Sequence, residues 1–436
     1  MGAYLDKPIT EKENEYGGDG RTSFGVSSMQ GWRKEMEDAH VCVPNVNDEQ
    51  NTAIYGVFDG HCGAEVARFV GKTIVDVLKK DSMFLHAKTA KDVGLSLGRA
   101  FHKLDDMIRD YETNGSYIES MKNKKTKDPM AAETDVPTAA GETQREALSR
   151  SVANDLKVAK AKGGLSQQQA VQLMFKMMYL EKLGGTVPTK PVEKEEGAAE
   201  EEEEHEESSP SSTTTNEDAS STHGAIEAGC TSVVVAIRND KIVTANAGDS
   251  RAVLSRAGKA VALSWDHKPQ DERERARITK AGGFVSENGR VNGNLNLSRS
   301  IGDLKYKMDR SIPAAEQIIT ADPDIHVEDL TSEDEFIIIA CDGIWDVLTR
   351  QEAVDEVHKR LRVMESTKGS SKTSSTAEGE SSFETLADIA ADILQNVCLA
   401  ENTQGSMGKG CDNMTLMIVD LRANARKATS TGETSK

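Results

Sequence analysis

Residues 233–263 read VVVAIRNDKIVTANAGDSRAVLSRAGKAVAL, which is four short apolar runs joined by tight connections. Connections this short force neighbouring strands to pair antiparallel, because a parallel pair needs a crossover of roughly a dozen residues or more. The stretch therefore predicts an antiparallel meander. Amphipathic helical patterns lie elsewhere in the chain, at residues 63–80, 90–110, 351–363 and 384–400. Strands in one block and helices in others favour a layered α+β protein.

The composition is acidic and only moderately apolar. The 436 residues include 53 Lys and Arg and 72 Asp and Glu, so the formal net charge is −19. A surface with this excess of acid repels phosphate backbones, which argues against direct binding of nucleic acid. Hydrophobic residues make up 37% of the chain and aromatic residues 4%. We therefore expect part of the chain to lie outside any packed core.

The six cysteines are widely spaced and form no CxxC pair. This pattern is typical of reduced thiols in a cytosolic or nuclear protein rather than of a disulfide framework or a zinc site. No apolar run approaches the roughly 20 residues that span a bilayer, and the first residues lack the apolar stretch of a signal peptide. We expect a soluble monomer that works in the cytoplasm, the nucleus or both.

The apolar runs are separated by a long insertion of different composition. We predict an N-terminal tail at residues 1–22, a single domain at 23–422 and a C-terminal tail at 423–436. The domain is interrupted by an insertion at 112–223 and by a flexible loop at 366–382. Within the insertion, residues 193–222 carry one basic and twelve acidic residues, a net charge of −11. Such a tract cannot bury a core, so we expect it to be disordered and solvated.

Part of the same insertion has helical periodicity. Ser166 and Gln169 form a capping-box pattern, and Gly184-Gly185 supplies a helix stop. We predict helices within residues 142–185, folded on themselves or on the main domain. The alternative is that their methionine-rich face binds a partner.

Five aspartates stand beside apolar runs, at Asp59, Asp249, Asp303, Asp342 and Asp412. Any one of them could be a turn residue, since Asp-Gly after a strand is a common turn. Carboxylates gathered at one edge of a sheet repel one another unless cations neutralise them. Mg²⁺ and Mn²⁺ prefer such oxygen ligands, whereas zinc would need His or Cys clusters. The spacing leaves two alternatives open, a polynuclear metal site and a set of separate turns.

Two metal ions close together suit phosphoryl transfer, because they lower the pKa of a shared water and hold the phosphate oxygens. Such a site also needs a cation for the phosphate and a proton donor for the leaving group. Arg33 can grip phosphate through two parallel hydrogen bonds. His61 follows Asp59-Gly60 and can act as a general acid near neutral pH. Taken alone, each would more often be a surface ion-pair residue or a turn residue.

These residues belong to an ordered set of motifs, namely Ser28-Met-Gln-Gly-Trp-Arg33, Met36-Glu-Asp-Ala-His40, Val57-Phe-Asp-Gly-His61, Gly229-Cys-Thr231, Ala247-Gly-Asp-Ser-Arg251, Asp266-His-Lys-Pro269, Leu297-Ser-Arg-Ser-Ile-Gly-Asp303, Ala340-Cys-Asp-Gly-Ile-Trp-Asp346 and Asp412-Asn-Met414. In this order they resemble the metal-dependent Ser/Thr protein phosphatases of type 2C. The start of the chain and the acidic insertion before Gly229 are most similar to the gamma-type members.

The resemblance implies a four-layer α/β/β/α sandwich of two antiparallel sheets flanked by helices, with a metal centre at one edge. It implies a phosphatase of phosphoserine and phosphothreonine that uses two Mg²⁺ or Mn²⁺ ions, with a hydroxide bridging them as the nucleophile. By similarity, Asp59 would bridge the two ions and the carbonyl of Gly60 would bind one of them. Asp342 and Asp412 would bind the other.

The same resemblance implies roles around these ligands. Glu37 and Asp38 would hold waters bound to the ions, and Asp249 would contribute to a third, weaker ion site. Arg33 would hold the phosphate, and His61 would protonate the departing serine or threonine oxygen.

Two further features follow from the same comparison. The segment between Asp266 and Asn294 corresponds to the variable flap of the family, beside the active site. Cys62 is a departure, because the family usually has glycine after Asp-Gly-His. It is either a tolerated small residue or a source of sensitivity to oxidation.

The expected partners are phosphorylated proteins. The Glu-rich tract would recruit basic phosphoproteins or serve as a solubilising spacer. Gly2 is similar to the acylated residue of N-myristoylated members, which would give weak membrane association, although Asp6 stands where that pattern prefers Ser or Thr. The alternatives to an active enzyme are a pseudophosphatase and an acidic binding module for basic proteins. Arg33 and all the expected metal ligands are present, which favours an enzyme.

Overall fold

The computed structural model describes residues 4–46, 51–110, 117–118, 120–121, 227–369 and 383–422. All of them belong to one compact unit, formed by Met1–Lys125 together with Ser221–Lys436. In the described part of the chain, no helix has the length and apolar composition to cross a membrane.

The larger sheet, sheet A, has antiparallel neighbours throughout. Its strands follow one another in the order β1 (Ile9–Gly18), β2 (Ser23–Gly31), β14 (Met414–Asp420), β13 (Asp334–Ala340), β9 (Arg251–Arg256) and β10 (Lys259–Ala262). The position of β1 corrects the predicted tail at residues 1–22. The sequence of β1 is mostly charged and polar, so no apolar pattern predicted a strand there. Its backbone pairing with β2 holds it in the sheet.

Sheet B is also antiparallel. Its strands run in the order β12 (Asp324–Asp329), β8 (Lys241–Ala247), β7 (Ser232–Arg238), β4 (Thr52–Phe58) and β3 (Ala39–Val43). A cluster of fully buried side chains from both sheets, including Val26, Tyr55, Val235 and Ile339, fills the space between them. The two sheets therefore pack face to face as a sandwich.

The predicted meander is divided between the two sheets. The β7–β8 hairpin lies in sheet B, whereas the β9–β10 hairpin lies in sheet A, and residues 248–250 cross from one to the other. β7 is buried along its whole length, and β8 and β9 are buried except near their ends. The residue pattern therefore predicts pairing within each hairpin and says nothing about which sheet each one joins.

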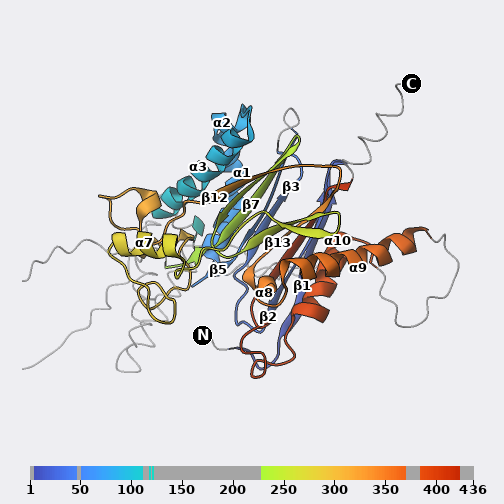
Figure 1. Cartoon of the computed structure of the whole chain (residues 1–436). Coiled ribbons are helices and arrows are strands. Elements are labelled where there is room, and N and C mark those ends of the chain that lie inside the picture. Colours follow the sequence, from blue (N-terminus) through green and yellow to red (C-terminus); the bar gives the residue numbers. More distant parts are fainter. Residues whose placement is uncertain are drawn as a thin grey trace, which may run out of the picture. The chain divides into compact units, whose positions relative to one another are not determined.

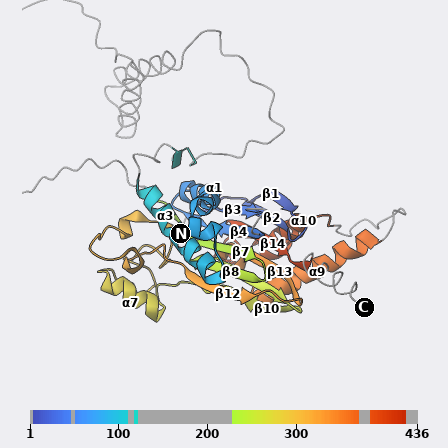
Figure 2. The ribbon, with the colours of Figure 1, turned by 90° about the horizontal axis from the view of Figure 1, so that it is seen from above.

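Helices cover both outer faces, which completes the predicted four layers. α1 (Glu65–Lys80) and α3 (Ala90–Arg109) pack on sheet B, and α9 (Arg350–Gly369) and α10 (Leu386–Ile393) pack on sheet A. Figures 1 and 2 show α1 and α3 on the opposite side of the strands from α9. Short α2 (Ser82–Leu85), α8 (Asp342–Trp345) and the π-turn η3 (Leu394–Cys398) extend these layers.

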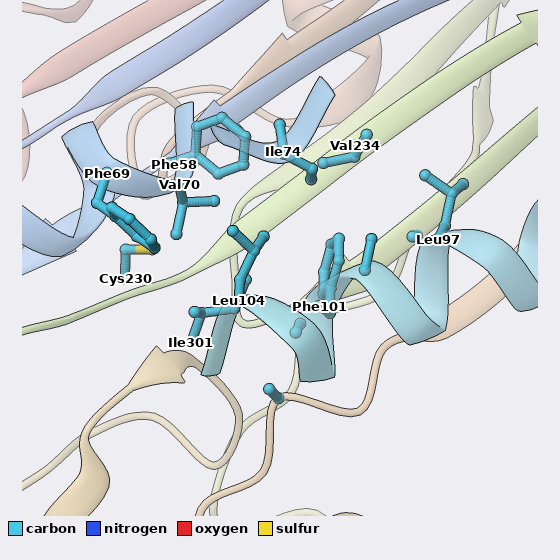
Figure 3. Close-up of a cluster of buried hydrophobic side chains, with 14 of the residues drawn as sticks. Phe58, Phe69, Val70, Ile74, Leu97, Phe101, Leu104, Cys230, Val234 and Ile301 are labelled. Carbon is cyan, nitrogen blue, oxygen red and sulfur yellow. The ribbon is translucent and has the colours of Figure 1, made fainter. Parts of the chain in front are cut away.

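Side chains spaced by one helical turn explain how α1 and α3 bind the sheet. Val70 and Ile74 of α1, with Leu97 and Phe101 of α3, are fully buried against strand residues such as Val234. Figure 3 shows these side chains converging in one cluster. Thr89 begins α3 with a reciprocal capping box, which satisfies the first free backbone amides of the helix.

A third sheet of three very short strands was not predicted. It consists of β11 (Ile301–Gly302), β6 (Gly229–Cys230) and β5 (Gly60–His61). Two-residue strands carry no periodicity, so only the tertiary structure can show them.

The predicted flap contains α7 (Glu272–Lys280) and loops that continue into the 3-10 turns η1 (Leu304–Tyr306) and η2 (Ala314–Glu316). It has a small apolar core of its own, formed by Ile278, Val291, Tyr306 and Ile319. A buried charge cluster beneath α7, centred on Glu274 and Arg299, ties it to the rest of the unit.

The predicted boundaries of the insertion fall partly inside the described residues. Ile118 and Met121, which lie within the predicted insertion at 112–223, are fully buried in the core against α1 and α3. The predicted helices at 142–185, the acidic tract and the C-terminal tail lie outside the described residues. α9 extends to Gly369, into the loop predicted at 366–382.

Candidate metal centre and active site

Strand register brings the predicted carboxylates to one end of the sandwich. β3 pairs antiparallel with β4, so Asp38, just before β3, lies beside Asp59, just after β4. β13 pairs antiparallel with β9, which places Asp342, just after β13, beside Asp249, just before β9. Asp412 precedes β14, the neighbour of β13, at the same end. The metal-site alternative of the sequence analysis therefore has the geometry it needs.

Three of these carboxylates form a tight group. Asp59, Asp249 and Asp342 each offer an oxygen, and all three oxygens lie within 4.8 Å of one another. Burial raises the pKa of both Asp59 and Asp342 well above the usual value, and neighbouring carboxylates raise it further. Carboxylates that repel in this way are stabilised by a divalent cation, so the residues present fit the metal that the sequence predicted.

Asp38 forms a second group with Asp59 and Cys341. Its Oδ2 accepts a hydrogen bond from Thr415 Oγ1 at 2.7 Å, while its buried Oδ1 has no hydrogen-bond partner within the described residues. Burial raises the pKa of Asp38 to about 6. A buried carboxylate oxygen without a partner is costly, and an ion or its bound water would satisfy it.

The side-chain amide of Asn413 makes three hydrogen bonds that help to hold the loop carrying Glu37. Asn413 Nδ2 donates to the carbonyls of Gln30 and Glu35 at 2.8 and 3.0 Å. Asn413 Oδ1 accepts from the backbone N–H of Glu37 at 2.9 Å. Glu37 Oε1 in turn accepts from the N–H of Gly63 at 2.6 Å. Asn413 thus ties the loop of Arg33 and Glu37 to the start of β14.

Arg33 lies at the open side of the carboxylates. Its Nη2 donates to Asp412 Oδ2 at 2.5 Å, and the two side chains are 36% and 33% exposed. Its Nε has no hydrogen-bond partner in the part of the chain that the structure describes. Gly31 allows this approach, because it has a φ of +66° and a Cβ there would lie 2.6 Å from the carbonyl oxygen of Asp412. The guanidinium is accessible to a ligand and retains unused donors.

The base of the flap reaches the same carboxylates. Lys268 Nζ donates to Asp249 Oδ2, and Arg251 forms a two-pronged ion pair with Asp266 at 2.6 and 2.9 Å. Burial lowers the pKa of Lys268, but the Asp249 carboxylate outweighs this effect and the net shift is upward. The sequence indicated no role for Lys268, because nothing in its spacing shows which carboxylate it meets.

His61 is paired with an aspartate from a distant segment. Its Nε2 lies 2.7 Å from Asp303 Oδ2, and Asp303 is only 2% exposed. Burial by itself lowers the pKa of His61, but the Asp303 carboxylate outweighs it and the pKa is raised. The sequence singled out Asp303 as a strand-end aspartate but assigned it to no partner.

Cys62 has an unusual backbone conformation. It is exposed and adopts a φ of +58°, the left-handed region that glycine occupies without strain. A glycine, which the resemblance in the motifs led us to expect here, would adopt this conformation without strain. Burial and the nearby Asp303 raise the pKa of the Cys62 thiol, so it is predominantly protonated at neutral pH.

The structure brings together the residues for which the sequence predicted a role in the active site, namely Arg33, Glu37, Asp38, Asp59, Gly60, His61, Asp249, Asp342 and Asp412. Their individual roles stay predictions. Asn413, Thr415 and Lys268 were not identified as site residues: Asn413 and Thr415 contact residues more than 370 positions away, and Lys268 meets Asp249 across the base of the flap. Gly2, the predicted acylation site, lies outside the described residues.

A two-sheet sandwich with buried carboxylates, an arginine and a histidine at one end defines a candidate metal-dependent hydrolase of phosphate esters. The profile of the family described as Protein phosphatase 2C matches residues 22–126 and 179–403. The chain therefore belongs to the protein phosphatase 2C family and is a metal-dependent phosphoprotein phosphatase. The resemblance found in the motifs is confirmed.

Curated relatives cover almost the whole chain. It is 35% identical to "Probable protein phosphatase 2C 11" of rice over 97% of this chain and 91% of that protein. It is 34% identical to "Protein phosphatase 1G" of the mouse, over 96% of this chain and 92% of that protein. A solved phosphatase of Toxoplasma gondii matches with a TM-score of 0.51 at 20% identity, over 95% of each chain, which supports the fold.

Proposed function

We propose that this phosphatase hydrolyses phosphoserine and phosphothreonine through a centre of two Mg²⁺ or Mn²⁺ ions. The observation that carries the proposal is the place of Asp59, which is shared by both groups of potential ligands. A carboxylate that belongs to two adjoining ligand sets is suited to bridge two cations.

The residues present favour a hard, oxygen-binding ion. We assign Asp59 and the carbonyl of Gly60 to one ion, and Asp59 with Asp342 and Asp412 to the other. Burial and nearby aspartates raise the pKa of Cys341 well above its usual value. Cys341 is a single thiol beside carboxylates, and the metal-ligand groups found among the described residues include no histidine or second cysteine, so the ligand set does not resemble a zinc site. Asp249 is assigned to a third, weaker ion site with Asp342.

The chain's own side chains supply the remaining chemistry. Bound divalent ions would lower the pKa of a water molecule and neutralise the phosphate oxygens. Arg33 would donate hydrogen bonds from its accessible guanidinium to the phosphate. Glu37, which is anchored by Gly63, would orient water, and His61 would give a proton to the serine or threonine oxygen as it leaves.

Hydrolysis of a phosphothreonine peptide tests the proposal, with Mn²⁺ or Mg²⁺ and then with a chelator. Wild-type turnover should require the ion. Asp342→Asn should lower kcat by roughly 10²-fold or more, because it removes charge from the ligand set. The matched control is Asp240→Asn, in the exposed turn between β7 and β8 at the opposite end of sheet B. This variant should keep wild-type turnover.

Two results would overturn the proposal. The first is metal-independent turnover, and the second is a folded Asp342→Asn variant that binds and uses Mn²⁺ like the wild type. A folded wild type that binds Mn²⁺ and hydrolyses no phosphopeptide would favour the pseudophosphatase alternative.

We also infer that the acidic tract recruits basic phosphoproteins. The net charge of −11 over residues 193–222 supports this inference. Within the described residues, Arg68 donates to the carbonyls of Met121 and of Met36, which precedes Glu37, at 2.7 and 3.0 Å. Met121, the last described residue before position 122, is thus linked to the loop that carries Glu37.

Deleting residues 126–220 tests this second function while leaving Ile118 and Met121 in the core. Turnover of a short phosphopeptide should survive, whereas binding and dephosphorylation of a lysine-rich phosphoprotein should weaken. A substitution series that replaces the glutamates of the tract by glutamine should act in the same way. Unchanged binding of the basic protein would refute the inference.

A further inference from the structure

The small third sheet places His61 opposite Asp303. In its register, His61 pairs with Gly229, and Gly229 pairs with Gly302 on the other side. Asp303 is the next residue after Gly302. Because Gly229 has no side chain, those of His61 and Asp303 can meet across the middle strand. A Cβ on Gly229 would lie 2.3 Å from Asp303 Oδ2 and 2.7 Å from His61 Nε2.

The main core holds this small sheet in place. Cys230 and Ile301, the neighbours of the paired glycines, are fully buried in the cluster beneath α1 and α3. Figure 3 shows Cys230 next to Phe69 of α1 and Ile301 next to Leu104 of α3. The strands that carry Gly229 and Asp303 are therefore anchored by apolar packing, independently of any bound ligand.

Asp303 itself is held in a conformation that an aspartate seldom adopts. Its φ is +50°, in the left-handed region. Its backbone N–H donates to the carbonyl of Ala228 at 3.1 Å. Its Oδ2 accepts from Ser300 Oγ at 2.5 Å as well as pairing with His61. These contacts hold the buried carboxylate in its left-handed conformation, and residues held in uncommon backbone conformations cluster at functional sites.

A buried ion pair supports the segment from below. Lys307 Nζ donates to Asp105 Oδ2 on α3 at 2.6 Å and to the carbonyl of Ser300 at 2.8 Å. Asp105 Oδ1 accepts from the N–H of Gly302 at 2.8 Å. Helix α3 is thus tied to the residues on both sides of Asp303.

We propose that Asp303 is the positioning residue of His61: its carboxylate accepts a hydrogen bond from Nε2–H and fixes the ring so that Nδ1 serves the leaving group. The proposal rests on the proposed function of His61 as the general acid. As the P–O bond breaks, the Nδ1 proton passes to the serine or threonine oxygen. The ring is left neutral, with its Nε2 proton still donated to Asp303, and solvent returns the Nδ1 proton.

Leaving-group dependence tests this role. Asp303→Ala should lower kcat for a phosphothreonine peptide by roughly 10²-fold, the scale of general acid catalysis, with little change in KM. Turnover of p-nitrophenyl phosphate should change far less, because its phenolate departs without a proton. Asp303→Asn keeps the size of the side chain and provides a second variant in case Asp303→Ala does not fold. The matched control is Asp309→Ala, an exposed aspartate of the same segment that should leave both substrates unaffected.

A double-mutant cycle with His61→Ala separates the proposal from its premise. If Asp303 acts through His61, adding Asp303→Ala to His61→Ala should cause no further loss of peptide turnover. Equal losses on both substrates, or additive losses in the double variant, would show that Asp303 is only structural. If His61→Ala itself affects both substrates equally, the assigned role of His61 fails. In that case the proposal for Asp303 falls with it, while metal-dependent turnover would still support the metal centre.

Discussion

The charge cluster beneath the flap offers a quantitative test of how α7 is held. Glu274 accepts from Arg299 Nη2 at 2.6 Å, from Arg277 Nη1 at 2.7 Å and from Ser298 Oγ at 2.7 Å. Glu274 and Arg299 are 3% and 2% exposed. We predict that Glu274→Gln, which keeps the shape and removes the charge, destabilises the protein strongly, because Arg277 loses its carboxylate partner and Arg299 keeps only Asp324.

The magnitude follows from the pKa. Burial raises the pKa of Glu274, but the arginine contacts outweigh it and lower the pKa from 4.5 to about 2. At about 1.4 kcal/mol for each pKa unit, this shift corresponds to about 3 kcal/mol of stabilisation. The folded-state pKa is the lower one, so the stabilisation is complete above pH 4.5 and is lost as the pH falls toward 2.

Urea-induced unfolding at pH 7, at a fixed concentration of metal, measures the effect. Glu274→Gln should lower the free energy of unfolding by about 3 kcal/mol without changing its dependence on urea. The control is Glu316→Gln, which removes an exposed ion pair with Lys280, the last residue of α7, and should have little effect. A loss below about 1 kcal/mol for Glu274→Gln, or an equal loss for both variants, would refute the reasoning.

Three further predictions concern the site. Cys62→Gly removes the strain of a cysteine in the left-handed region and should raise the free energy of unfolding by roughly 0.5–1 kcal/mol. The gain is smaller than the strain energy itself, because glycine also gains more conformational entropy on unfolding. An unchanged midpoint in urea would contradict this prediction. Asn413→Ala removes two hydrogen bonds to the Arg33–Glu37 loop and one to Gln30 of β2, and it should weaken Mn²⁺ binding measured by titration calorimetry, whereas exposed Asn402→Ala should not. Burial raises the pKa of Asp38 from 3.8 to about 6, so its ionisation destabilises the metal-free protein as the pH rises through this window. In chelator, Asp38→Asn should therefore gain thermal stability relative to the wild type between pH 4 and pH 7, and a constant difference would argue against it.

Much of the fold could be predicted from residue patterns because the physical signals are local. Apolar runs of strand length with four-residue connections predicted the β7–β8 and β9–β10 hairpins, and amphipathic spacing predicted α1 and α3 within a few residues. β1 was missed because it lies at a sheet edge with mostly exposed side chains, so its sequence carries no apolar alternation. The division of the two hairpins between the sheets was also missed, because their central strand residues are buried on both faces.

The site divides along the same line. By itself, the sequence determined which reactive side chains stand next to the apolar runs. Asp59 and Asp342 follow such runs directly, and Arg33 and His61 end two of the short motifs. Such features can be recognised because they depend on residues that are close together in the chain. Only the tertiary structure decided which of them meet. It placed Asp303 against His61 across Gly229, which lies 168 residues after that histidine in the chain. The register of β5, β6 and β11 brings these three residues together. Pairing of distant backbone segments depends on the whole core that holds them, and no local pattern of residues contains that information.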